Sequence, residues 1–210
     1  MNFLPVKIPE IFKTVFPNRT WYIDTDEKVI YLTFDDGPTP VITDWVLDCL
    51  KKFKAQATFF CIGKNVEAHP RIYQRILKEK HAVGNHTFNH MNGWKTNNST
   101  YLNDINLAEQ HIDSILFRPP YGRINREQSK LILGADFKII MWTVLSKDYN
   151  KKVLPQECLK NVIKNVDRGS IIVFHDSEKA FKNMQYTLPR FLDIYSAKGF
   201  NFKRIPESIL

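Results

Sequence analysis

The fold is decided by the sequence YLTFDDGP at residues 31–38. The β-branched and aromatic run at residues 29–34 predicts a buried strand. This strand ends abruptly in two adjacent carboxylates, Asp35 and Asp36, and the Gly-Pro pair after them turns the chain out of the sheet. Acids at the carboxyl end of a buried strand stand where α/β folds keep their reactive groups, although Asp-Asp-Gly-Pro is also ordinary turn chemistry.

Composition predicts one soluble globular domain, because 210 residues with 43% hydrophobic and 25% charged residues can bury a single sizeable core. The net charge of +8 is spread without a block of like charge, which favours a solvated basic surface over a nucleic-acid site. The three cysteines are not closely paired, so no disulfide framework is expected. Pro5, Lys7, Pro9 and Glu10 interrupt any apolar core of signal-peptide length, and no stretch reads as a transmembrane helix.

Apolar strands alternate with segments of helical period along the chain. Strands are predicted at Val29–Phe34, Ala57–Ile62, His81–Asn85, Leu116–Arg118, Phe137–Val144, Ser170–Phe174 and Phe200–Ile205, and helices at Val41–Lys54, Pro70–Lys80, from Ser99 or Thr100 to about Ile115, Arg126–Leu133, Pro155–Asp167 and Gln185–Lys198. Continuous apolar strands with a helix between each pair imply a parallel sheet. We therefore expect an α/β fold, a distorted and incomplete (β/α) barrel with about seven parallel strands. Residues 1–28 are expected to be an N-terminal extension packed on the barrel, and residues 29–210 a single domain.

Polar side chains follow the ends of several predicted strands. They are Asp35 and Asp36, His86, Arg118, Asp148 and His175. In a parallel barrel the carboxyl ends of the strands converge on one face. We therefore expect these side chains to meet in one functional site.

Metal binding is predicted from two histidines and one of the two acids. His86 and His90 are four residues apart, so both imidazoles lie on one face if the segment turns helically. A lone pair of this kind is more often structural, but Asp36 offers a third ligand. Two histidines and one carboxylate with open positions describe a catalytic divalent-metal site, for which zinc is the default and cobalt or nickel accept the same ligands.

Acid and base roles are predicted for two residues beside this metal site. Asp35 adjoins Asp36 and can take a proton from an attacking water; otherwise it caps the following turn. His175 ends an apolar strand, where an isolated histidine is usually satisfied within the core. Facing a metal across the barrel mouth, it is expected to act as a general acid.

These residues stand in motifs that resemble those of the polysaccharide deacetylases with the NodB homology domain, carbohydrate esterase family four, over about residues 29–205. TFDDGP at residues 33–38 is similar to the first motif, and the resemblance makes Asp35 the catalytic base and Asp36 a metal ligand. HTFNH at residues 86–90 resembles the second motif and gives both histidine ligands.

The third and fifth motifs of the family are also matched. RPPY at residues 118–121 resembles the third, and the resemblance implies that Arg118 orients Asp35 while the Tyr121 backbone N–H helps to bind the oxyanion. Phe-His at residues 174–175 resembles the fifth motif, with His175 as the general acid.

The fourth motif departs from the family pattern of Asp-x-x-Asp-Trp, because this chain has LSKDY at residues 145–149. Asp148 matches the second acid, which the resemblance casts as the partner that tunes His175. Leu145 and Tyr149 replace the first acid and the tryptophan. The catalytic set is thus complete, and the departure falls on the wall that would contact the sugar.

The activity implied by the resemblance is metal-dependent removal of N-acetyl groups from glycans that contain N-acetylglucosamine (chitin-like, peptidoglycan or another polysaccharide), with release of acetate. One alternative keeps the metal site for an O-acetyl ester or a non-sugar amide or imide, because Leu145 and Tyr149 change the wall. Another alternative is a sugar-binding protein that has lost catalysis. The complete set of acids and histidines argues against it. We expect an acetylated glycan as partner, no nucleic acid and a monomer. The family generally works on envelope or extracellular glycans, whereas this sequence shows no export signal, so the compartment stays open.

Overall fold

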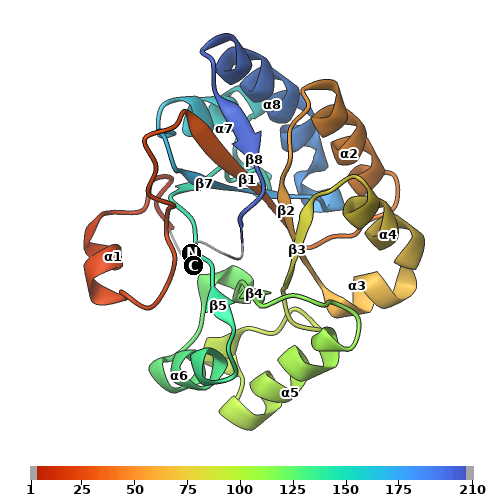
Figure 1. The fold of residues 1–210 in the computed structure, drawn as a ribbon, viewed down its shortest axis with the longest axis vertical. Helices are drawn as coiled ribbons and strands as arrows, with labels where there is room; N and C mark the ends of the chain where they lie inside the picture. The colour runs from red at the N-terminus through yellow and green to blue at the C-terminus, as the bar shows by residue number, and fades with distance from the viewer. Residues whose placement is uncertain (1–3, 207–210) are drawn as a thin grey trace.

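The computed structural model describes residues 4–206, in which a curled parallel sheet is surrounded by helices (Figure 1). The strands are β1 (Val29–Asp35), β2 (Thr58–Cys61), β3 (Ala82–Asn85), β4 (Leu116–Phe117), β5 (Lys138–Ile139), β6 (Val144–Leu145), β7 (Ile171–His175) and β8 (Asn201–Lys203). Seven of them follow the order β5-β4-β3-β2-β1-β7-β6, and β8 pairs with the first half of β1. The predicted incomplete barrel of about seven parallel strands is confirmed.

Most helices lie between successive strands, as the alternation predicts, although the first helix precedes β1 and residues 140–143 join β5 to β6 without a helix. The helices are α1 (Ile11–Val15), α2 (Ile42–Lys52), α3 (Gly63–Ala68), α4 (Pro70–Lys78), α5 (Asn98–Glu109), α6 (Arg126–Gly134), α7 (Pro155–Ile163) and α8 (Glu178–Ala197), with short 3-10 turns at Gly93–Lys95 and Pro120–Gly122. Helix α8 begins well before the predicted Gln185, because Ala180 and Met184 are already buried on its inner face. Within residues 4–206, no helix combines the length and apolarity that crossing a bilayer requires.

One predicted strand is wrong. Residues 137–144 do not form a continuous strand but divide into β5 and β6, which lie at opposite ends of the sheet. Several backbone groups of residues 140–143, between the two strands, form hydrogen bonds with partners outside the sheet. The carbonyls of Ile140 and Met141 accept hydrogen bonds from the Arg118 guanidinium, and the Met141 N–H donates to the carbonyl of Thr20. We call residues 140–143, which join the two sheet ends, the seam.

The N-terminal segment lies along this seam. Thr20 pairs with Ile140 in a parallel bridge, and Lys7 pairs with Val144 in an antiparallel one. The Ile8 N–H also donates to the Thr143 carbonyl at 2.9 Å. The described part of the predicted extension, residues 4–28, thus packs on the barrel, while residues 1–3 lie outside the described residues. The division of the chain at residue 28 stays a prediction.

Two apolar clusters occupy the two faces of the sheet. Strand β1 sends Ile30, Leu32 and Phe34 outward, toward α2 and α8, and sends Val29 and Tyr31 into the barrel. The outer cluster includes Phe34 stacked on Phe59, with ring centroids 5.1 Å apart. Because side chains alternate along a strand, Asp35 faces the inside of the barrel with Tyr31.

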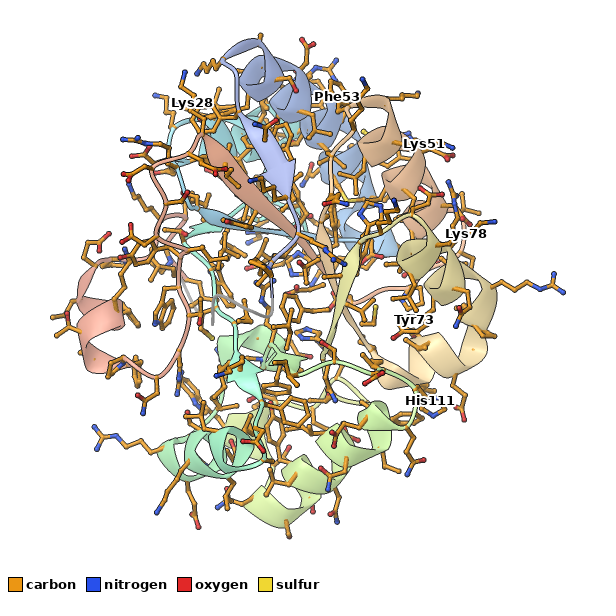
Figure 2. All side chains as sticks on the ribbon, viewed as in Figure 1. Lys28, Lys51, Phe53, Tyr73, Lys78 and His111 are labelled. Carbon is orange, nitrogen blue, oxygen red and sulfur yellow. The ribbon has the colours of Figure 1, made fainter. Side chains whose placement is uncertain are left out.

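Basic side chains are dispersed over the outside. Lys28, Lys51 and Lys78 are exposed and come from three separate parts of the chain, as Figure 2 shows. This arrangement agrees with the dispersed charge that the sequence indicates.

Candidate active site

Strands β1 and β7 bring an acid and a histidine together at the carboxyl end of the sheet. The two strands are parallel neighbours, and their register places Asp35 opposite His175. On β7, Ile171 and Val173 belong to the inner cluster, so the same alternation turns His175 into the barrel. The predicted convergence of polar residues at this face therefore follows from strand register.

Asp35 is held by a fully buried arginine. The Arg118 side chain is 0% exposed, and its Nη1 donates to Asp35 Oδ1 at 2.7 Å and to Thr33 Oγ1 at 2.6 Å. Its other nitrogens donate to the two seam carbonyls at 3.1 and 2.8 Å. The guanidinium also lies over the ring of Phe60, 4.0 Å from its centroid. The hydrogen bond from Arg118 sets the orientation of the Asp35 carboxylate, which lines the pocket described below.

Asp36, His86 and His90 form the cluster that could hold a metal ion, with one ligand atom from each within 4.8 Å of the others. Asp36 Oδ1 lies 3.1 Å from His90 Nε2 and 3.7 Å from His86 Nε2. His86 Nδ1 lies 2.7 Å from the Arg118 carbonyl, which leaves Nε2 for a ligand. Burial lowers the pKa of His86 to about 4, so the ring is neutral at pH 7, as a metal ligand must be.

The two histidines of this cluster stabilise the ionised form of Asp36. Burial alone would raise the pKa of Asp36, but the hydrogen bond from His90 and the nearby histidines hold it below its usual value. Asp36 and His90 have positive φ angles of 81° and 56°. Both ligands therefore sit in strained turns that their surroundings must maintain.

A buried carboxylate on α5 holds the turn that carries the two histidines. Asp104 Oδ2 accepts the backbone N–H groups of Phe88 and Asn89, and Oδ1 accepts the Asn89 side-chain amide at 2.6 Å. Sequence reasoning missed this residue. A signal was present, because Asp104 stands on the apolar face of its helix with Tyr101 and Ile105, where an unpaired acid is rare.

His175 is paired with Asp148, the residue that the resemblance casts as its partner. Asp148 Oδ1 lies 2.8 Å from His175 Nδ1, and Oδ2 accepts the His175 backbone N–H at 2.8 Å. Burial by itself would lower the pKa of His175, but Asp148, with smaller contributions from Asp36 and Asp35, raises it to about 9. The imidazole is therefore protonated at neutral pH and can donate a proton.

These groups line one pocket of about 420 Å³, and the predicted residues converge on it. Asp35, Asp36, His86, His90, Tyr121 and His175 line its wall, while Arg118 and Asp148 stand behind Asp35 and His175. Tyr121 has a positive φ of 60°, and its ring lies 4.6 Å from that of His90. Leu145 and Tyr149 complete the side near His175, where Tyr149 packs edge-on against the imidazole at 4.9 Å.

Comparisons with known proteins agree with the motifs. The sequence profile described as polysaccharide deacetylase matches residues 22–140. A peptidoglycan-N-acetylglucosamine deacetylase of Bacillus cereus is 33% identical over 195 residues, covering 90% of this chain and 91% of the relative. A chitooligosaccharide deacetylase of Azorhizobium caulinodans is 30% identical, covering 73% and 76% of the two chains. The crystal structure of the Bc1960 peptidoglycan N-acetylglucosamine deacetylase superposes with a TM-score of 0.88 at 31% identity, over 99% of this chain and 97% of that one.

Proposed function

The chain belongs to the polysaccharide deacetylase family, and on this premise we propose that it hydrolyses N-acetyl groups of N-acetylglucosamine-containing glycans and releases acetate. One observation carries the proposal. Asp35, held by Arg118, and His175, paired with Asp148, lie opposite each other on neighbouring strands and line the same pocket as a three-residue metal-ligand set. A base, an acid and a metal site in one pocket are the groups that hydrolysis of an unactivated amide needs.

The metal ligands proposed are Asp36, His86 and His90. The family implies a divalent metal, and the donor set fits one, since it combines a carboxylate held in its charged form with a buried neutral imidazole. We assign zinc as the resident metal, with cobalt or nickel able to replace it. The cation would polarise the acetyl carbonyl and help to ionise the attacking water.

Asp35 is proposed as the general base. Its carboxylate faces the pocket beside Asp36 and accepts the attacking water's proton. Arg118 holds one carboxylate oxygen, so the base keeps a fixed orientation through the reaction. The backbone N–H of Tyr121 is proposed to stabilise the developing oxyanion, in line with its place on the pocket wall beside His90.

His175 is proposed as the general acid. An amine anion is a very poor leaving group, so the C–N bond breaks only as a proton reaches the nitrogen. Asp148 keeps the imidazole charged and fixes its Nδ1, which leaves Nε2 for the leaving amine.

A second candidate activity, hydrolysis of an O-acetyl ester or a non-sugar amide or imide at the same site, is favoured by the apolar wall. Leu145 is 2% exposed and lines the pocket together with Tyr149, where the family usually has an acid and a tryptophan. An alkoxide leaves far more readily than an amine anion. His175→Ala should therefore cost amide hydrolysis much more than ester hydrolysis.

The test is acetate release from a panel of peptidoglycan, chitin oligosaccharides and O-acetylated glycans, with Asp35→Asn as the matched inactive control. We expect acetate from N-acetylated glycans with wild type only. Release from O-acetylated substrates alone would select the second activity. Glycan binding without acetate release from any substrate would refute the enzyme proposal. The monomeric state stays a prediction.

A further inference from the structure

Asp176 is a buried carboxylate that the proposed reaction does not use. It follows His175 directly and is 0% exposed. Its Oδ1 accepts the Gly37 backbone N–H at 3.1 Å, and its Oδ2 accepts the Thr43 hydroxyl at 2.5 Å. Its own N–H donates to the Asp35 carbonyl at 3.1 Å. No ion pair within residues 4–206 includes it.

A buried acid without a cationic partner is expensive to keep, so its contacts need an account. Its hydrogen bonds with the backbone groups of Gly37 and Asp35 both join it to the turn that carries Asp35 and Asp36. The fit at this turn is tight, because a Cβ added to Gly37 would lie 2.0 Å from Asp176 Oδ2. The carboxylate therefore lies directly against the backbone that follows Asp36.

The turn needs such support because Asp36 has a φ of 81°, in a region that residues with a side chain rarely adopt. On its other side the turn is held by the Asn65 side-chain amide, which donates to the Asp36 carbonyl at 2.8 Å. The Ile62 N–H donates to the Gly37 carbonyl at 2.9 Å. The peptide group between Asp36 and Gly37 is therefore held at both ends. Asn65 donates to its carbonyl, and Asp176 accepts from its N–H.

We propose that Asp176 is a positioning residue of the metal centre, whose hydrogen bond to the Gly37 N–H holds the Asp36 carboxylate where it meets His86 and His90. This inference rests on the proposed role of Asp36 as a metal ligand. Groups that orient a ligand typically contribute about 10-fold to 100-fold to metal affinity. The hydrogen bond, rather than the negative charge, carries the effect.

The test measures zinc affinity of the metal-free protein by competition with a chromophoric chelator. Asp176→Ala should bind zinc about 10-fold to 100-fold more weakly than wild type. Asp176→Asn should stay close to wild type, because its amide oxygen can still accept from Gly37 while its amide nitrogen donates to Thr43. If Asp176→Ala does not fold, Asp176→Leu serves instead, since its side chain is close to aspartate in shape but offers Gly37 no acceptor.

Leu192→Ala is the matched control for stability. Leu192 is fully buried near the other end of α8, and its truncation should lower the melting temperature without changing zinc affinity. His90→Ala is the control for loss of a ligand.

Wild-type affinity in Asp176→Ala would overturn the positioning role while leaving the metal site intact. Equal losses in Asp176→Asn and Asp176→Ala would also overturn it, because the charge would then carry the effect. Equal losses in Leu192→Ala and Asp176→Ala would overturn it in favour of global stability. Failure of wild type to bind zinc would overturn both this inference and the proposed metal site.

Discussion

Replacing Asp148 by Asn should move the alkaline limit of activity, because it removes the charge that keeps His175 protonated. The imidazole Nδ1 lies 2.8 Å from Asp148 Oδ1, and the Asp148 side chain is fully buried. Burial would lower the pKa of His175, and Asp148 outweighs it in raising the value from 6.5 to about 9. At about 1.4 kcal/mol per pH unit, that rise corresponds to roughly 3 to 4 kcal/mol in favour of the charged ring.

The sign follows from the proposed acid role. Activity requires the protonated imidazole, so the wild-type rate should fall as pH rises toward about 9. A cation at Asp36 would offset the contribution of that carboxylate and bring the limit somewhat lower, while the contribution of Asp148 persists. In Asp148→Asn, burial still lowers the pKa of His175 but the carboxylate that mainly raises it is gone, so the pKa should fall to 6.5 or below. We expect the alkaline limb to move by about two pH units toward acid.

The assay is a pH–rate profile of acetate release for both proteins, with an NMR titration of the His175 ring as a direct readout. The acidic limb should not move, because the substitution leaves Asp35 and its hydrogen bond from Arg118 unchanged. Stability gives an independent check. A folded-state pKa raised above the unfolded value stabilises the protein fully below pH 6.5, and this contribution disappears as pH rises through about 9. Wild type should lose that stability over this range and the mutant should not. An alkaline limb that stays in place in Asp148→Asn would refute the assignment.

Three further changes test the other parts of the site. Asp35→Asn keeps the shape of the base but cannot accept a proton, so kcat/KM should fall by about two to four orders of magnitude at unchanged metal content; near-native turnover would exclude Asp35 as the base. His90→Ala should lose most of the bound metal in elemental analysis, and chelation of wild type should abolish activity that zinc or cobalt restores; unchanged stoichiometry would reject the ligand set. Gly122→Ala should lower kcat, because Gly122 has a φ of +67° and an added Cβ would lie 2.5 Å from the Trp142 ring, whereas Gly134→Ala, with nothing within 4 Å, should match wild type. Equal kinetics in these two glycine variants would show that the turn before Gly122 plays no part in the rate.

The sequence predicts the strand ends well because local patterns determine them. Residues 29–34 are apolar on both faces, and side-chain alternation then turns Asp35 inward whatever the rest of the chain does. The family indicated by the motifs is confirmed by the comparisons. The same local reasoning fails at residues 137–144, which are equally apolar. There the outcome depends on Arg118, whose guanidinium takes the backbone carbonyls that a strand would use.

The sequence also did not predict two acids whose partners lie elsewhere in the chain. Asp104 contacts a turn about fifteen residues earlier in the chain, and Asp176 binds Gly37, 139 residues away. Helix α3 was also missed, since six residues are too few for a helical period to be read. For the two acids, the information lies in tertiary contacts rather than in a pattern along the chain.

The seam also has a consequence for how an active molecule is made. Arg118, which holds the proposed base, takes its carbonyl partners from the seam, and the seam contacts Thr20 and Ile8 across more than a hundred residues of sequence. Contacts of such long separation carry a large loop-closure cost and form slowly. The ribosome must therefore have made the seam before the N-terminal segment can find its partners. A chain still emerging during synthesis cannot hold the base in place. Activity should therefore appear only after the N-terminal segment has docked on the seam.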